Sequence, residues 1–412
     1  ENSKSKIELP NGVKFFGDFH DFSKIQADLI VRTPAVNPSR LPKSAKITSV
    51  TNLFFEKCPA PIIGVTGSKG KGTVSSFIAE ILRAAGLKVY LVGNIGLPAL
   101  NELSEIQKDD AVIYELSSFQ LWDAQKSPHI AILNNLEVDH LDVHDGFEDY
   151  AAAKMNIAKN QTKNDFFIFN AENPIVLKNV ENLKNQLKAE LQPFQDYNLA
   201  HIQENHFLWG DEVLFETNIL KIPGEHNQKN ACAAMIATFD FLREKGFGIE
   251  EIFDFWREGL SKFTGLPHRL KFVREFEGVR FYDDSIATTP GSAIAALNSF
   301  EKPKILILGG SNKGADLSEL IEKIEKMPEQ ELRKVILMGA ESEKLAQKLI
   351  SSGFERFINL GVKTNMQEVV KTAFENAKSG DVVILSPAHA SFDMFKSYVD
   401  RGEQFVENVN LL

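Results

Sequence analysis

Short apolar runs alternate with longer segments of helical periodicity along the first half of the chain. Asp28–Val31 (DLIV) is the first short strand that this pattern predicts, and Ile62–Thr66 (IIGVT) is a continuous apolar run typical of a buried strand. Residues 71–85 have the spacing of a helix that stops at Gly86. The same reasoning predicts strands at Val89–Val92, Ala111–Tyr114 and Ile130–Leu133, and one further helix at 147–160. Strands that alternate with helices predict a parallel sheet covered on both faces.

The pattern changes after residue 194. Residues 195–223 are polar, aromatic and irregular, which predicts short antiparallel strands, and helices are predicted at 226–245 and 249–260. Near Gly265-Leu266-Pro267 we expect a domain boundary, followed by a hairpin and a second β-α-β series. The strands of this part are predicted at 270–276, 279–282, 305–308, 335–338 and 382–385. We therefore expect an α/β protein with domains at 1–57, 58–266 and 267–412.

Composition narrows the function classes. Hydrophobic residues make up 43 % of the 412 residues and charged residues 25 %, which are ordinary globular values. The net charge of −10 argues against a protein that coats nucleic acid. The two cysteines exclude a secreted disulfide framework and favour the reducing cytoplasm. Apolar runs stay below the roughly 18 residues of a membrane span.

Thr66–Thr73 (TGSKGKGT) is the strongest chemical signal. It follows a predicted strand and opens a predicted helix, where backbone N–H groups and the helix dipole favour a phosphate. Lys71 would reach the terminal phosphates, and Thr73 would hold Mg²⁺. The loop departs from the usual pattern at Val65, where glycine is expected, and at Gly72, where a hydroxyl residue is expected. The alternative is a glycine-rich turn that only closes a β-α unit.

Several separate strings in register resemble the Mur ligase family of peptidoglycan synthesis. They are GVTGSKGKGTV, GNIGLPAL (93–100), ELSSFQL (115–121), IPGEHNQKNA (222–231), FTGLPHRL (263–270), DDSIATTP (283–290), GGSNKGAD (309–316) and LSPAHASFDMFKSYVDRGEQF (385–405). ELSSFQL most resembles the members that add glutamate to UDP-N-acetylmuramoyl-L-alanine. The resemblance implies three domains: an N-terminal UDP-substrate domain that looks incomplete, a central ATP-binding domain of P-loop type and a Rossmann-like C-terminal domain that binds the amino acid.

The resemblance also assigns roles to individual residues. The implied catalytic residues are Lys71, Glu115, His140 and Lys154. The implied ligands of two magnesium ions are Thr73, Glu115, His140 and Lys154, the last as a carbamate formed with CO₂. The implied ATP-binding residues are Gly67, Ser68, Gly70, Lys71, Gly72, Thr73, Asn227, Asn230, Arg269 and Asp284. The implied substrate-binding residues are Asn94, Ser117, Ser118, Thr288, Lys313, Ser391 and Tyr398.

Read without the resemblance, some of these residues have plainer explanations. Glu115 could cap a helix, and Ser117, Ser118 or Asn227 could be N-cap residues. Once the resemblance assigns His140 to magnesium, His144 is expected to be a surface residue. Two positions depart from the family pattern: Ile286 stands where lysine is usual, and Tyr398 stands where phenylalanine is usual.

The expected function is an ATP-dependent amide ligase that forms an acyl phosphate and adds D-glutamate to UDP-N-acetylmuramoyl-L-alanine. Its partners are expected to be small molecules, with no nucleic acid and no membrane, and the chain is expected to be a monomer. Ile286 leaves an L-glutamate-adding ligase open, and a folylpolyglutamate synthase shares the layout. From another class, the run Asp139–Asp145 (DHLDVHD) suggests a zinc metallohydrolase. A non-catalytic nucleotide-binding module is the remaining alternative.

Overall fold

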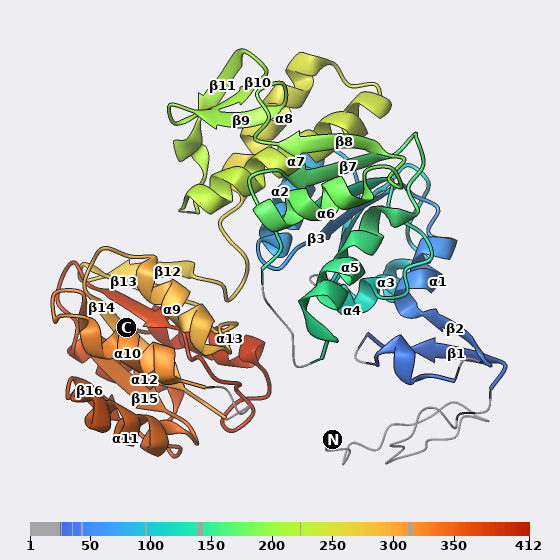
Figure 1. Ribbon diagram of the computed structural model, residues 1–412. Coiled ribbons are helices and arrows are strands. Elements are labelled where there is room, and N and C mark those ends of the chain that lie inside the picture. The colour runs from blue at the N-terminus through green and yellow to red at the C-terminus, as the bar shows by residue number, and fades with distance from the viewer. Residues whose placement is uncertain are drawn as a thin grey trace. The chain divides into compact units, whose positions relative to one another are not determined.

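The computed structural model describes residues 25, 27–34, 36–42, 44–94, 97–137, 143–222, 224–311 and 316–412. The chain divides into two compact units (Figure 1). The first comprises the residues up to Ile219 together with Glu225–Lys262, and the second comprises Leu220–Gly224 and Phe263–Leu412. The N-terminal strands group with the central sheet in the first unit, and the division into three domains stays a prediction.

The first unit is built on a sheet of six parallel strands in the order β4-β5-β3-β6-β7-β8. In chain order these strands are β3 (Ile62–Thr66), β4 (Val89–Gly93), β5 (Ala111–Glu115), β6 (Ile130–Leu133), β7 (Phe166–Asn170) and β8 (Glu190–Phe194). All five residues of β3 are buried, as its continuous apolar run predicts. The chain leaves β3 first toward one edge of the sheet and later toward the other. Ligands of open α/β sheets bind outside the carboxyl ends of strands at such a switch point.

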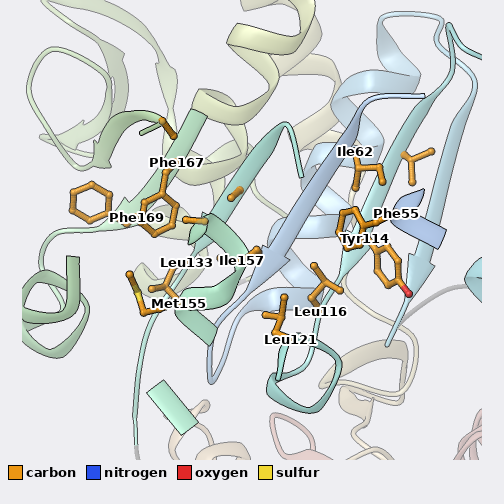
Figure 2. Packing of buried hydrophobic residues seen from close by; sticks show 14 of the residues in the cluster. Phe55, Ile62, Tyr114, Leu116, Leu121, Leu133, Met155, Ile157, Phe167 and Phe169 are labelled. Carbon is orange, nitrogen blue, oxygen red and sulfur yellow. The ribbon is translucent and has the colours of Figure 1, made fainter. Parts of the chain in front are cut away.

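Helices cover both faces of this sheet. They are α1 (Val50–Lys57), α2 (Lys71–Ala84), α3 (Ala99–Glu102), α4 (Ser118–Leu121), α5 (Gly146–Lys159), α6 (Pro174–Leu183), α7 (Glu225–Glu244) and α8 (Ile249–Lys262). On one face, side chains of α1, α5 and α6 pack with alternate strand residues into one apolar cluster, which includes Tyr114, Leu133 and Met155 (Figure 2). On the other face lie α2 and α7, with α8 against α2. Gly86 has a φ of +76° and ends α2, as predicted.

Two small sheets complete the unit. Strands β1 (Leu29–Arg32) and β2 (Lys46–Ser49) pair in parallel. The buried Arg32 side chain forms an ion pair with Asp123 and donates to the Phe119 carbonyl oxygen, which ties this sheet to the α4 region. Strands β9 (Ala200–Gln203), β10 (His206–Trp209) and β11 (Glu212–Glu216) form an antiparallel sheet, as predicted for 195–223.

The second unit has a six-stranded sheet in the order β12-β13-β17-β14-β15-β16, in which only the β12–β13 hairpin is antiparallel. The strands are β12 (Lys271–Phe276), β13 (Val279–Asp283), β14 (Lys304–Gly309), β15 (Leu332–Met338), β16 (Phe357–Asn359) and β17 (Val382–Leu385). Its helices are α9 (Pro290–Asn298), α10 (Ser318–Lys326), α11 (Ser342–Ser352), α12 (Met366–Glu375) and α13 (Tyr398–Asn410). Side chains of α9, α10 and α11 fill the apolar cluster on one face, and those of α12 and α13 fill the cluster on the other.

The observed architecture is the predicted α/β class with parallel sheets. Within the described ranges, no helix is long and apolar enough to cross a membrane. Cys58 and Cys232 are both free thiols, and burial raises the pKa of Cys232 to about 12.

Candidate functional site

The loop between β3 and α2 has the geometry of an anion site. Gly67 and Gly70 have φ values of +148° and +79°, which the missing side chains permit. Gly70 is the N-cap of α2, and it provides no side-chain hydrogen bond to the first turn. The helix dipole and the N–H groups of that turn therefore face the loop, which is the arrangement that binds phosphate.

Residues that follow β6 hold this loop from below. Asn135 accepts hydrogen bonds from the backbone N–H of Ser68 at its carbonyl oxygen (2.9 Å) and from that of Lys69 at Oδ1 (2.8 Å). Asn134 Nδ2 donates to the carbonyl oxygen of Lys69 (3.1 Å). The Ser68 hydroxyl oxygen lies 2.8 Å from the Tyr150 hydroxyl of α5. These contacts from neighbouring residues fix the conformation of the loop.

Two lysines meet at one carbonyl oxygen of the loop. Lys71 Nζ donates to the carbonyl oxygens of Gly67 (3.0 Å) and Ser68 (3.1 Å), and Lys154 Nζ donates to the same Gly67 oxygen (2.8 Å). Lys154 is buried, and its Nζ lies 4.8 Å from the centroid of the Tyr150 ring. The predicted catalytic lysines, which are distant in sequence, therefore lie side by side at the phosphate loop.

Glu115 and Asn94 lie at the carboxyl ends of neighbouring strands. Glu115 ends β5 and is buried, and its Oε1 accepts a hydrogen bond from Asn94 Nδ2 (2.9 Å). The Asn94 N–H also donates to the Glu115 carbonyl oxygen (3.0 Å). Glu115 does not cap a helix, because the N-cap of α4 is Ser117. A buried carboxylate and the Thr73 hydroxyl, buried in the first turn of α2, are hard oxygen donors of the type that magnesium prefers.

Ser117 and Ser118 have different roles in the structure. Ser117 is the N-cap of α4 in a capping box with Gln120, so the plainer explanation holds for its side chain. Ser118 is 1 % exposed, and its hydroxyl oxygen lies 2.9 Å from His144 Nε2. His144 was expected at the surface, and this expectation is wrong: its side chain is fully buried, with Nδ1 2.7 Å from Asp149 Oδ2.

Two asparagines of α7 reach the phosphate loop from the other side. The Asn230 Oδ1 atom accepts a hydrogen bond from Asn134 Nδ2 (2.8 Å), and Asn230 Nδ2 donates to Asn227 Oδ1 (3.3 Å). Asn227 is not an N-cap residue, because α7 already begins at Glu225. These predicted ATP-binding residues of α7 and the phosphate loop thus belong to one hydrogen-bonded network, with Asn134 at its centre.

In the second unit, predicted ATP-binding residues lie beside a strained segment. His268 and Leu270 have positive φ values of 59° and 42°, which residues other than glycine rarely adopt. They flank the exposed Arg269. Asp284 accepts hydrogen bonds from the Leu270 N–H (3.1 Å) and the Ser386 hydroxyl (2.7 Å). Burial raises the pKa of Asp284 to about 7, although these two hydrogen bonds and Arg269 favour its charged form.

The predicted substrate-binding residues of this unit lie on segments that a buried arginine joins. Arg401 of α13 donates from Nη2 to the Ser285 carbonyl oxygen (2.8 Å) and from Nη1 to the His389 carbonyl oxygen (3.1 Å). Burial lowers its pKa to about 10, so the group stays charged at neutral pH. The segment with Ser285 continues to Thr288, which is half-buried, and the segment with His389 continues to Ser391, which is buried. Tyr398 is 38 % exposed at the start of α13.

Two predicted site residues, His140 and Lys313, lie outside the described residues. The run that suggested a metallohydrolase is described only at Val143, His144 and Asp145, and its described histidine bonds to Ser118 and Asp149. In the part of the chain that the structure describes, no group of three or more His, Cys, Asp or Glu residues is placed to hold a metal ion.

Sequence reasoning missed the residues that support the site. They are Asn134, Asn135, Tyr150, His144 and Arg401. One signal was available for the first two, because polar residues directly after a buried strand lie at the carboxyl edge of a parallel sheet. Arg401 carried no comparable signal, since an arginine in a helix is usually solvated.

Comparisons with known proteins identify the family of this chain. A family model described as "Mur ligase middle domain" matches residues 65–238, and one described as "Mur ligase, glutamate ligase domain" matches residues 268–389. The UDP-N-acetylmuramoylalanine–D-glutamate ligase of Acetivibrio thermocellus is 38 % identical over 404 residues, which cover 93 % of this chain and 82 % of that protein.

Solved structures show the same fold at low sequence identity. The UDP-N-acetylmuramoylalanyl-D-glutamyl-2,6-diaminopimelate–D-alanyl-D-alanyl ligase of Acinetobacter baumannii has a TM-score of 0.64 at 17 % identity, covering 90 % of this chain and 83 % of that one. The folylpolyglutamate synthase of Mycobacterium tuberculosis, solved with ADP and AMPPCP, has a TM-score of 0.63 at 14 % identity, covering 86 % and 94 %. The matched domains, the 38 % identity and the shared fold together show that this chain belongs to the Mur ligase family.

Proposed function

We propose that this chain is an ADP-forming ligase that joins D-glutamate to UDP-N-acetylmuramoyl-L-alanine in peptidoglycan synthesis. The observation that carries the proposal is the meeting of Lys71 and Lys154 at the phosphate loop after β3, with Glu115 at the carboxyl end of the neighbouring strand β5. The name of the Acetivibrio thermocellus relative supplies the substrates. The ligation would take place in the cytoplasm, and its product would serve cell wall growth, cell shape and cell division.

The first chemical step would transfer the γ-phosphoryl group of ATP to the alanyl carboxylate. A carboxylate oxygen forms the new P–O bond, the bond to the β-phosphate oxygen breaks, and ADP leaves. Lys71 and the N-terminal turn of α2 would neutralise the charge that spreads over the transferring group. Thr73 and Glu115, with His140 and a Lys154 carbamate, would hold magnesium, which neutralises phosphate charge when bound.

The second step would form the amide bond. The glutamate amine attacks the acyl-phosphate carbonyl carbon, a tetrahedral intermediate forms, and its collapse expels inorganic phosphate. Water has to be kept away, because it would hydrolyse the acyl phosphate. Thr288, Lys313, Ser391 and Tyr398 would hold the amino acid, and the cation with the hydroxyls suits a dicarboxylate.

The carbamate on Lys154 has a physical rationale in the loop. Two ammonium groups that share the Gly67 carbonyl oxygen repel each other, and Lys154 is the more buried of the two. Reaction of the Lys154 amine with CO₂ releases a proton and forms an N–C bond, which replaces a cation with an anion. The repulsion from Lys71 then becomes attraction, and the new oxygens suit magnesium.

Phosphate release with UDP-N-acetylmuramoyl-L-alanine, ATP and a panel of amino acids tests the proposal. We expect phosphate release that depends on both the acceptor and D-glutamate. Release with a folate acceptor instead would favour a folylpolyglutamate synthase. ATP-independent hydrolysis that needs zinc would favour the metallohydrolase.

The isomer of glutamate is tested in the same assay. We expect D-glutamate, because specificity depends on the combined geometry of the donors and not on the one cation that Ile286 lacks. A kcat/KM that favours L-glutamate by about tenfold or more, roughly 1.4 kcal/mol, would replace D-glutamate with L-glutamate and leave the ligase mechanism in place.

A further inference from the structure

The buried His144 side chain uses both ring nitrogens. Its Nδ1 lies 2.7 Å from Asp149 Oδ2, and its Nε2 lies 2.9 Å from the Ser118 hydroxyl oxygen. Its ring stacks on Phe119 with centroids 5.3 Å apart and meets Trp122 at 4.4 Å and Tyr150 at 5.2 Å. A histidine with this many partners has a fixed orientation.

The direction of the hydrogen bonds follows from Asp149. Burial raises the pKa of this carboxyl, but hydrogen bonds from His144, Trp122 and the Asp145 N–H outweigh burial and lower it. An ionised carboxylate only accepts, so His144 Nδ1 carries the proton toward Asp149. In the neutral ring Nε2 is then an acceptor, and the Ser118 hydroxyl donates to it.

This order of serine, histidine and aspartate resembles a hydrolase triad, but its burial gives it another use. A nucleophile has to be reached by its substrate, and Ser118 is 1 % exposed. The three residues instead fix the segment that joins β5 to α4. Glu115 lies three residues before Ser118 on this segment, and Ser117 lies between them as the N-cap of α4.

The same helix connects this segment to the phosphate loop. Asp149 and Tyr150 are neighbours in α5: Asp149 holds His144, and the Tyr150 hydroxyl lies 2.8 Å from the Ser68 hydroxyl oxygen. Helix α5 therefore contacts both the segment after β5 and the loop after β3, and holds the two in a fixed relative position. The alignment of an acceptor bound at the end of β5 with the γ-phosphate would depend on this fixed relative position.

We propose that His144 is a positioning residue of the ligase, which with Asp149 holds the Ser118 hydroxyl and so fixes the Glu115–Ser118 segment for the muramoyl substrate. The inference rests on the proposed function for the identity of that substrate.

The test is His144→Phe, which keeps an aromatic ring and removes both hydrogen bonds. We expect the KM for UDP-N-acetylmuramoyl-L-alanine to rise roughly tenfold, the effect of one or two lost hydrogen bonds, while the KM for ATP stays within about threefold. Ser118→Ala should have a similar effect. In the double variant the loss should be about that of one single variant, since both act through the same contact.

His129→Phe is the matched control. His129 also bridges two carboxylates, with Nδ1 2.9 Å from Asp165 and Nε2 2.9 Å from Glu244. It directly precedes β6, however, and so lies at the amino ends of the strands, away from the carboxyl ends that carry the site. It should lower the thermal unfolding temperature without changing the KM for the acceptor. If His144→Phe does not fold, Ser118→Ala and Asp149→Asn carry the same comparison.

A folded His144→Phe protein with an unchanged acceptor KM overturns the inference, and so do independent, multiplicative losses in the double variant. These outcomes differ from failure of the proposed function, in which the unmodified protein releases no phosphate with the muramoyl acceptor.

Discussion

Gly70→Ala tests whether the phosphate loop and helix α7 form one network. Alanine at a φ of +79° costs about 1 kcal/mol in backbone strain. A Cβ atom there would lie 2.2 Å from Asn134 Nδ2 and 2.8 Å from Asn230 Oδ1, which is closer than real contacts allow. Both asparagines have to move, and the hydrogen bond between them is lost.

The magnitude follows from these contacts. Losing a buried hydrogen bond and leaving a polar group unpaired adds about 2 kcal/mol to the strain, so the free energy of unfolding should fall by about 3 kcal/mol. Gly86→Ala is the matched control, because Gly86 has a φ of +76° and its added Cβ meets no atom within 4 Å. It should cost about 1 kcal/mol, since it carries the strain alone.

Urea unfolding of both variants measures the difference. Both glycines lie in the first unit, Gly70 as the N-cap of α2 and Gly86 just beyond its C-cap, so the same transition is compared for each. ADP titration is the second measurement: Gly70→Ala should weaken ADP binding by about tenfold or more, and Gly86→Ala should leave it unchanged. Equal unfolding midpoints together with equal ADP affinities would refute the network.

Three further predictions concern individual charges. Lys71→Ala should lower kcat by about a thousandfold or more with the fold intact, whereas Lys69→Ala should remain active, since that exposed side chain pairs with Glu137; normal phosphate release by Lys71→Ala would contradict the loop assignment. Lys154→Ala should be nearly inactive and partly rescued by short carboxylic acids, and full activity without an additive would argue against a carbamate. Burial raises the pKa of Asp240 to about 7, so the contribution of this group to stability should fall as the pH rises from about 4 to above 7. Asp240→Asn should therefore raise the unfolding temperature at pH 8 but hardly at pH 4, and an equal effect at both pH values would contradict this.

The local sequence predicted most strands and helices of the fold because their apolar runs are continuous or periodic. IIGVT fills β3, and the two helices predicted after residue 223 are α7 and α8. Strand order was beyond this reasoning, since nothing within Val382–Leu385 indicates that β17 lies between β13 and β14. That placement depends on contacts between segments distant in sequence.

The residues of the candidate site likewise fall into those that the local sequence predicts and those that depend on tertiary contacts. Lys71 could be placed because its loop has a strand before it and a helix after it. Lys154 came only from resemblance, because a lysine in a helix is usually solvated, and its approach to the Gly67 carbonyl oxygen is a tertiary contact. His144 was misplaced because the resemblance gave the metal role to His140 and left His144 without a function, whereas three aromatic rings and Ser118 enclose it.

The position of β17 also affects how the protein is made. The ribosome completes β13, β14, β15 and β16 before it adds the strand that joins β13 to β14. Until then, each of these two strands keeps a row of unpaired N–H and C=O groups along its inner edge, and apolar residues such as Phe281 and Ile307 lack part of their packing. In the first unit the order is reversed, because the central strand β3 is made before its partners β5 and β6. We therefore expect the second unit to be more exposed to aggregation and proteolysis than the first when synthesis stalls before Val382.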